Sequence, residues 1–197
     1  MPKLTFWFEF ASTYSYLSAM RIEELAVKAG VEIAWKPFLL GPIFKAQGWD
    51  SSPFNLYPAK GKYMVRDIGR MAEARGLQFR LPEPFPQNGL HAARLALVGL
   101  EEGWGPEFVK GVYRAGFADG RDISEPAVLA TELEVAGANA ENAMARAQAP
   151  HIKEKLRANT GEAQAAGIFG APSFTTSAGE LFWGDDRLEQ ALVWSLR

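Results

Sequence analysis

The sequence predicts an α/β fold in which a small sheet is interrupted by a long helical segment. Two strand-like stretches near the amino terminus, 3–10 and 31–36, flank a stretch with helical spacing of apolar residues. Two shorter strand-like stretches, 173–176 and 180–183, form a hairpin near the carboxyl terminus. Between them, residues 43–166 carry almost entirely helical patterns. We therefore expect one sheet built from both ends of the chain.

The first two strands and the helix between them form one unit. Residues 3–10 predict a buried strand because they are mostly aromatic or β-tolerant and contain no proline. The helix that follows has apolar residues at i, i+3, i+4 and i+7 and ends at Gly30. Alternation from 31 to 36 predicts the second strand. A strand, a helix and a strand make a βαβ unit, so the two strands should be parallel.

The middle of the chain predicts a loop followed by helices. No period is sustained from 41 to 58, so this stretch is expected to be a loop. Asn88, Ser124 and Asn139 stand at expected helix caps, and Pro150 suits a first helical position. The predicted helices cover 59–75, 88–103, 106–118 and 124–137, a shorter one opens at Asn139, another covers 150–166, and the last follows a cap at Asp185 or Asp186.

Composition and charge narrow the class of protein. The chain is 48% hydrophobic and 12% aromatic, which is typical of a globular protein. Its formal net charge is -2 with mixed signs, so we expect neither nucleic acid nor an anionic membrane surface as a partner. The apolar run at 4–10 is short and contains Glu9, so we expect no secretory signal, no membrane span and a cytoplasmic location.

Cysteine is absent from the sequence, and there are two histidines. The lack of cysteine excludes disulfides, thiolate metal sites and a redox cycle on the protein's own sulfur. His91 and His151 lie far apart, without carboxylates at ligand spacing, so no metal site is expected.

Ser12 is the first candidate for a reactive position. It lies between the strand at 3–10 and the following helix, where the carboxyl edge of an α/β sheet and the free amides of a helix start meet. A serine in this position also caps a helix, which stabilises it by about 1 kcal/mol. Judged on this junction alone, capping is the favoured role.

Two tight turns, at 170–172 and 183–186, are further candidates for the site that contains Ser12. Pro172 opens a strand, and local residues favour a trans bond before it, because only about 5% of X-Pro bonds are cis. If Ala171 is exposed there, its backbone groups can pair with an extended peptide as an added strand does.

Four segments together resemble the 2-hydroxychromene-2-carboxylate isomerases, a family close to the kappa-class glutathione transferases with a DsbA-like thioredoxin fold. They are Phe-Glu-Phe-Ala-Ser-Thr-Tyr-Ser-Tyr-Leu at 8–17, Pro-Ala-Lys-Gly-Lys-Tyr-Met at 58–64, Gly-Ile-Phe-Gly-Ala-Pro-Ser-Phe at 167–174 and Leu-Phe-Trp-Gly-Asp-Asp-Arg-Leu at 181–188. The resemblance spans essentially the whole chain. It implies a thioredoxin-like (DsbA-type) domain split between 1–42 and 167–197, interrupted by an all-helical insertion at 43–166.

The resemblance also implies glutathione as the cofactor and assigns its contacts. Ser12 would face the glutathione sulfur, and the backbone of Ala171, before a Pro172 expected to be cis, would bind the cysteinyl unit. The turn at 183–186 would grip the γ-glutamyl end. The implied cofactor-binding residues are Ser12, Thr13, Tyr14, Ala171, Pro172, Trp183, Gly184, Asp185 and Asp186.

The sequence departs from the family pattern at two places. Thr13 stands where members often have proline. Unlike proline, threonine has a backbone N–H, so it adds a hydrogen-bond donor to the turn. The usual asparagine before Pro58 is not matched, because Asp50 and Ser51 straddle its position. Asp50, Ser51 and Lys60 are the candidates for binding the substrate. Lys60 belongs to a charged helix face that is by default solvated, and it is also a candidate for binding the substrate's carboxylate or glutathione.

A thiol borrowed from glutathione is consistent with the missing cysteine. Lowering a thiol pKa from about 8.5 to about 6.5 requires roughly 2.7 kcal/mol of preference for the thiolate. A helix start supplies roughly 0.3 to 2 kcal/mol, and a hydroxyl donating to the charged sulfur adds about 1.5 to 3 kcal/mol. Ser12 is therefore expected to stabilise the thiolate instead of acting as the nucleophile.

The expected activity is the isomerisation of 2-hydroxychromene-2-carboxylate to trans-o-hydroxybenzylidenepyruvate, or of a similar aromatic keto acid. The thiolate would add to the conjugated carbon, the resulting single bond would rotate, and glutathione would leave unchanged. Two alternatives remain open: a kappa-like glutathione transferase, which conjugates glutathione, and a non-catalytic module that binds extended peptides. Family members are commonly dimers, so a homodimer is expected.

Overall fold

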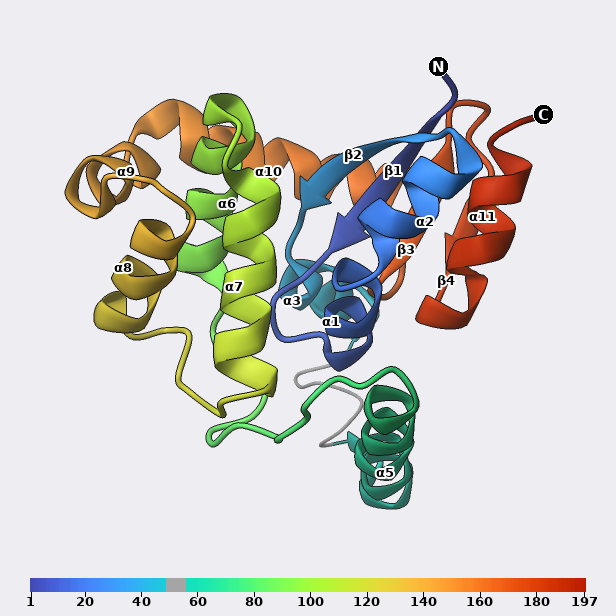
Figure 1. Cartoon of the computed structure of the whole chain (residues 1–197), viewed down its shortest axis with the longest axis horizontal. Helices are drawn as coiled ribbons and strands as arrows, with labels where there is room; N and C mark the ends of the chain where they lie inside the picture. The colour runs from blue at the N-terminus through green and yellow to red at the C-terminus, as the bar shows by residue number, and fades with distance from the viewer. Residues whose placement is uncertain (49–55) are drawn as a thin grey trace.

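The computed structural model, described here for residues 1–48 and 56–197, builds the fold on a four-stranded sheet (Figure 1). Strands β1 (Lys3–Phe8) and β2 (Glu32–Pro37) are parallel, as the sequence predicts, and β3 (Ser173–Thr176) runs antiparallel to both β1 and β4 (Leu181–Trp183). The predicted hairpin is therefore confirmed. The order of the strands in the sheet is β2-β1-β3-β4.

One edge of this sheet collects ends of all four strands. Because β3 runs opposite to β1 and β4, the carboxyl ends of β1, β2 and β4 lie at the same edge as the amino end of β3. The segments 9–12, 38–40, 170–172 and 183–186 therefore meet there, although the first and the last are more than 170 positions apart in the chain.

Helices from both ends of the chain and from its middle surround the sheet (Figure 1). The helices near the termini are α1 (Thr13–Ala19), α2 (Ile22–Ala29) and α11 (Leu188–Trp194), with the 3-10 turn η1 (Asp185–Arg187) before α11. The helices between them are α3 (Leu40–Ala46), α5 (Pro58–Ala74), α6 (Leu90–Glu102), α7 (Gly105–Phe117), α8 (Pro126–Val135), α9 (Ala140–Ala147) and α10 (Pro150–Ala165). Among the described residues, no helix has the length and apolar character needed to cross a bilayer.

The alternation of side chains along β1 divides the core. Phe6 and Phe8 point into the main hydrophobic core, whereas Trp7 points to the other face and joins a smaller cluster with Phe38 and Ile43. The main core continues from the sheet into α6, α7, α8, α9 and α10. The helical segment thus shares one core with the sheet, and α3 crosses the expected boundary between 42 and 43. The division into 1–42, 43–166 and 167–197 stays a prediction.

Two elements differ from the sequence-based expectation. The helix expected to run to Gly30 is broken between Met20 and Arg21, where the Arg21 side chain turns to bind Asp185. The start of the loop expected at 41–58 instead forms α3, because Ile43 packs in the smaller cluster. Because Ile43 is the only buried residue of α3, the sequence of this short helix shows no apolar period.

The caps were predicted with mixed success. Asn139 caps α9 as expected, accepting the Asn142 amide at 2.8 Å. Ser124 does not cap α8, which begins after Glu125 with Pro126 in its first turn. Asn88 lies one residue before the cap Gly89, although its side chain accepts the Leu90 amide at 3.0 Å. The prediction that Asp185 or Asp186 caps the last helix is wrong, because both lie in η1.

Candidate functional site

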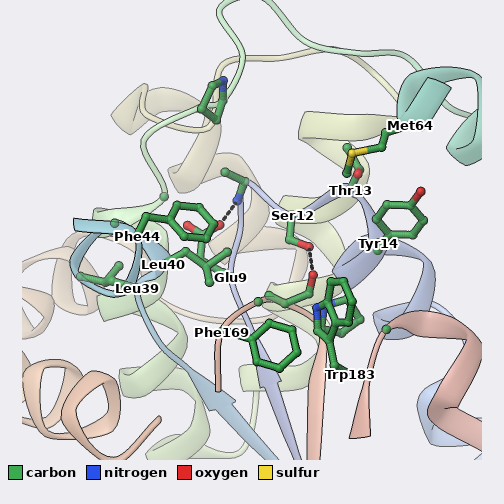
Figure 2. A pocket seen from close by; sticks show the side chains of 18 of the residues that line it. Glu9, Ser12, Thr13, Tyr14, Leu39, Leu40, Phe44, Met64, Phe169 and Trp183 are labelled. Carbon is green, nitrogen blue, oxygen red and sulfur yellow. Dashed lines mark hydrogen bonds between the residues drawn. The ribbon is translucent and has the colours of Figure 1, made fainter. Parts of the chain in front are cut away.

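A cavity of about 1320 Å³ opens at the sheet edge where the four strand ends meet (Figure 2). It is lined by most of the site residues that the sequence predicts, namely Ser12, Thr13, Tyr14, Lys60, Ala171, Pro172, Trp183, Gly184, Asp185 and Asp186. The structure therefore brings ten predicted positions from four separate segments into one site. The candidates Asp50 and Ser51 lie outside the described residues.

Ser12 is held by hydrogen bonds on both sides. It is the N-cap of α1, and its Oγ accepts the Ser15 amide at 3.1 Å, so the capping role is confirmed. The same Oγ donates to the backbone oxygen of Ala171 at 2.8 Å (Figure 2). Because a hydroxyl has one proton, the donor of Ser12 is committed to Ala171 in this structure.

The first turn of α1 offers further donors beside Ser12. Within the described part of the chain, the backbone amides of Thr13 and Tyr14 have no acceptor, as expected for a helix start. The Tyr14 hydroxyl donates to Oδ2 of Asp67 at 3.0 Å. Burial, and next the hydrogen bond to Asp67, raise the pKa of Tyr14 well above its usual value, so this phenol stays neutral.

The peptide bond between Ala171 and Pro172 is cis. The trans form favoured by the local sequence is therefore wrong, and the cis form implied by the family resemblance is confirmed. Two further cis bonds, before Pro84 and Pro86, were not anticipated from the sequence.

Trp183 and Phe169 form an aromatic wall at the cavity mouth. Their ring centroids lie 4.9 Å apart, and the two residues are 51% and 45% exposed, so both offer apolar surface to a ligand. Gly170 makes this arrangement possible, since a Cβ added there would lie 2.5 Å from Nε1 of Trp183.

The turn after β4 presents one acidic side chain and buries the other. Gly184 has φ of 107°, a conformation that favours glycine, and it turns the chain into η1. The Asp185 carboxylate is fully buried and binds Ser18 at 2.9 Å and Arg75 at 2.6 Å, besides Arg21. Asp186 is exposed, so in this turn its carboxylate is the one that remains accessible from the cavity.

Several cavity residues were missed as site residues in the sequence. Leu40, Phe44 and Lys45 belong to α3, which the sequence presents as loop, and Met64 was not among the predicted site residues. Glu9 was noted only as a charge within an apolar strand. That charge was the available signal, because an unpaired carboxylate in a buried strand is rare without a function.

Glu9 lies on the cavity wall just beyond the end of β1. Its Oε2 accepts the Ala11 amide at 2.8 Å (Figure 2), and no donor among the described residues reaches Oε1. Tyr113, from α7, donates its hydroxyl to the backbone oxygen of Glu9 at 2.9 Å. Burial raises the pKa of Glu9 to about 7, and the Ala11 hydrogen bond offsets part of that rise. This carboxyl can therefore exchange a proton near neutral pH.

Fold and site together define a class of protein. A family model of the DSBA-like thioredoxin domain matches residues 3–192, and the chain belongs to that family. Among described residues, no cluster of three or more His, Asp or Glu side chains suits a metal ion. The chain retains the family's fold but carries Ser12 and no cysteine at its strand-to-helix junction.

Particular relatives narrow the class further. The chain is 27% identical over 188 residues to the 2-hydroxychromene-2-carboxylate isomerase of Sphingobium xenophagum, covering 94% of each protein. It is 28% identical over 204 residues to glutathione S-transferase kappa 2 of Caenorhabditis elegans, covering 94% of this chain and 88% of that protein. The solved structure of a 2-hydroxychromene-2-carboxylate isomerase matches the fold of this chain with a TM-score of 0.87 at 23% identity. The match covers 99% of this chain and 96% of that chain. The relatives are thus enzymes, an isomerase and a transferase.

Proposed function

We propose that this protein is a glutathione-dependent isomerase of an α,β-unsaturated aromatic keto acid, with 2-hydroxychromene-2-carboxylate as the first substrate to test. The observation that carries the proposal is the hydrogen bond from Ser12 to Ala171 inside a large cavity. It places a hydroxyl, free helix amides and a strand-like backbone segment at one point. That combination suits a peptide thiol in a protein that has no thiol of its own.

The residues present fit glutathione. Ala171 precedes β3 and offers backbone groups for an extended peptide, while the exposed Trp183 and Asp186 offer apolar contact and a carboxylate for the γ-glutamyl end. The Asp185 carboxylate is occupied by internal partners, so its contribution to a ligand would come from its backbone. When bound, glutathione would supply a thiolate that adds reversibly to the conjugated carbon of the substrate.

Ser12 would change its hydrogen-bond partner on binding. To donate to sulfur, its hydroxyl must release the Ala171 oxygen, which it now holds at 2.8 Å. The backbone amide of a bound cysteinyl unit can replace that donor. Ser12 keeps accepting the Ser15 amide throughout, which holds Oγ in position. Thr13 and Tyr14 add their free amides beside it.

The other end of the cavity suits an aromatic acid. Leu39, Leu40 and Phe44 form apolar wall, and Lys45 and Lys60 also line the cavity. A lysine would pair with the substrate carboxylate while the apolar wall takes the aromatic ring. The role of Lys60 as that partner remains a prediction.

Calorimetry and product analysis test this function. We expect reduced glutathione to bind the wild-type protein, and we expect 2-hydroxychromene-2-carboxylate to be converted over many turnovers while total glutathione stays constant. Stoichiometric loss of glutathione would instead support the kappa-like transferase. A protein that binds extended peptides but gives no glutathione-dependent rate would support the non-catalytic module. A homodimer, which sedimentation would detect, is part of the same proposal.

A further inference from the structure

Glu9 has a position in the cavity that the thiolate chemistry leaves without a role. Its carboxyl lines the same cavity as Ser12, yet it is on the side of the apolar wall from α3, away from Trp183 (Figure 2). Its two oxygens are unequal: the Ala11 amide holds Oε2 at 2.8 Å, and Oε1 has no hydrogen-bond donor among the described residues. A fixed carboxyl with one free oxygen in an apolar wall is suited to proton transfer.

We propose that Glu9 is the proton-transfer group that opens the cyclic form of the substrate before the thiolate acts. The proposal rests on the substrate class of the proposed function. In a 2-hydroxychromene, one carbon bears both the hydroxyl and the ring oxygen. Ring opening therefore requires one proton to move between two oxygens bonded to the same carbon.

A single carboxyl can perform both transfers. Ionised Glu9 takes the hydroxyl proton through Oε1, and the electrons of that O–H bond form the new carbonyl. The bond between the carbon and the ring oxygen breaks, and its electron pair stays on the ring oxygen. The protonated Glu9 returns its proton to this oxygen, which gives the phenol and the open cis keto acid. Glu9 is regenerated, and no oxidant or other reactant is needed.

The surroundings of Glu9 permit this chemistry near neutral pH. From α7 it is faced by Tyr113, which donates to its backbone oxygen and leaves its carboxyl free. From α3 and α5, Lys45 and Lys60 line the same cavity, and neither contributes to the pKa of Glu9 through an ion pair. Since burial dominates its pKa, Glu9 is not locked in the ionised form by a cation.

Ring opening can be measured without glutathione. Magnetisation-transfer NMR on 2-hydroxychromene-2-carboxylate follows exchange between the cyclic and open cis forms in the presence of the protein alone. We expect the wild-type protein to accelerate this exchange, with a rate that rises with pH through about 7. Glu9→Gln, which keeps an oxygen for the Ala11 amide, should reduce the acceleration at least about a hundredfold and remove the pH dependence.

Matched variants separate this role from a structural one. Glu154→Gln removes one exposed carboxylate on α10 and should leave the exchange rate unchanged. Glu9→Asp keeps a carboxyl and should retain part of the rate. This variant tests the role of the carboxyl even if Glu9→Gln folds poorly. Glutathione affinity should be the same in all four proteins. Infrared spectroscopy of the ligand-free protein should show a protonated carboxyl near pH 6 that Glu9→Gln lacks.

Each outcome decides between the two proposals. Exchange by Glu9→Gln at the wild-type rate would overturn the role of Glu9, whether or not glutathione supports isomerisation. Exchange that depends on Glu9 without any effect of glutathione would overturn the proposed function and retain the ring-opening role. A wild-type protein that does not accelerate the exchange would overturn the Glu9 proposal alone, provided that glutathione still binds and the open form is isomerised.

Discussion

The Ser12 hydroxyl accepts one hydrogen bond within its own helix and donates one to Ala171, 159 residues further along the chain. The first bond belongs to local capping and could be anticipated from the sequence. The second exists because β3 runs antiparallel to β1 and brings its amino end to the carboxyl end of β1. One side chain thus carries both a structural role and the proposed binding role, and substitutions at this position will affect both.

Ser12→Ala should raise the thiol pKa of bound glutathione. Losing a hydrogen bond to a charged sulfur costs about 1.5 to 3 kcal/mol, which corresponds to about 1 to 2 pKa units. The thiolate absorbance of the complex as a function of pH measures this. Ser177→Ala, in an exposed turn, is the control. The lost cap should also cost about 1 kcal/mol of stability. An unchanged thiol pKa would contradict the role of Ser12.

Gly170→Ala should weaken glutathione binding and hardly change stability. The added Cβ would meet Nε1 of Trp183 at 2.5 Å, and the half-exposed indole can swing outward to avoid it. Displacing the Trp183 indole should reduce the affinity for glutathione on the order of tenfold, about 1.4 kcal/mol, as measured by calorimetry. Gly161→Ala is the matched control, because a Cβ there meets nothing within 4 Å. Equal affinities for the two variants would show that Trp183 does not contact the ligand.

Helix α5, which lies beyond α1 from the sheet (Figure 1), lines the cavity with residues that include Lys60, Met64 and Asp67. Two polar contacts tie it to the strand ends: Tyr14 to Asp67 near its middle, and Arg75 to Asp185 just past its end. Asp185 also binds Ser18 and Arg21, so a single buried carboxylate joins α1, α2, η1 and α5. The position of α5 beside the cavity therefore depends on the buried Asp185 carboxylate, which a bound ligand does not contact.

Asp185→Asn should strongly destabilise the fold. The substitution leaves Arg21 and Arg75, whose side chains are 18% and 26% exposed, without their buried counter-charge, and only Arg21 keeps a second carboxylate partner, Glu189. Removing one partner of a buried ion pair costs about 3 to 5 kcal/mol, and the partial exposure of both arginines favours the lower value. Urea unfolding measures the change. Asp186→Asn, next to it but exposed, should shift stability by less than about 0.5 kcal/mol. Similar losses in both variants would exclude Asp185 as the anchor.

At the scale of the whole molecule, the main core extends from the sheet to α9 and α10 without a break. Glu9 lies at its border, where β1 ends and the cavity begins. Because burial disfavours its ionised form, this carboxyl couples the stability of the entire fold to pH.

The stability of the wild-type protein relative to Glu9→Gln should fall as pH rises. The pKa of Glu9 is about 7 in the folded protein, compared with 4.5 for an unperturbed glutamate, so the folded state binds more protons between these values. The contribution is fully present below about pH 4.5 and is lost as pH rises to about 7. The total change is at most about 3 kcal/mol. Urea unfolding of both proteins at pH 4.5 to 8 measures it, and parallel curves would contradict it.

Local patterns predicted most of the helices and strands, the parallel β1–β2 pair and the β3–β4 hairpin, because each depends on neighbouring residues. They failed for α3, for the break between α1 and α2, and for the bond before Pro172. In the first two cases a long-range contact decides the local structure, Ile43 with its cluster and Arg21 with Asp185. Most site residues came from the family resemblance, since no local rule distinguishes Trp183 or Asp186 from other surface residues.

The sequence by itself determined the alternation of secondary structure, the serine at the start of α1 and the absence of cysteine, since these are properties of composition and short-range order. Only the tertiary structure decided which polar groups meet. In this structure Ser12 donates its proton to Ala171, Asp185 binds Arg21 and Arg75, and no donor from residues 1–48 or 56–197 reaches Oε1 of Glu9. These outcomes depend on burial and on contacts between segments more than a hundred residues apart, which no local pattern encodes.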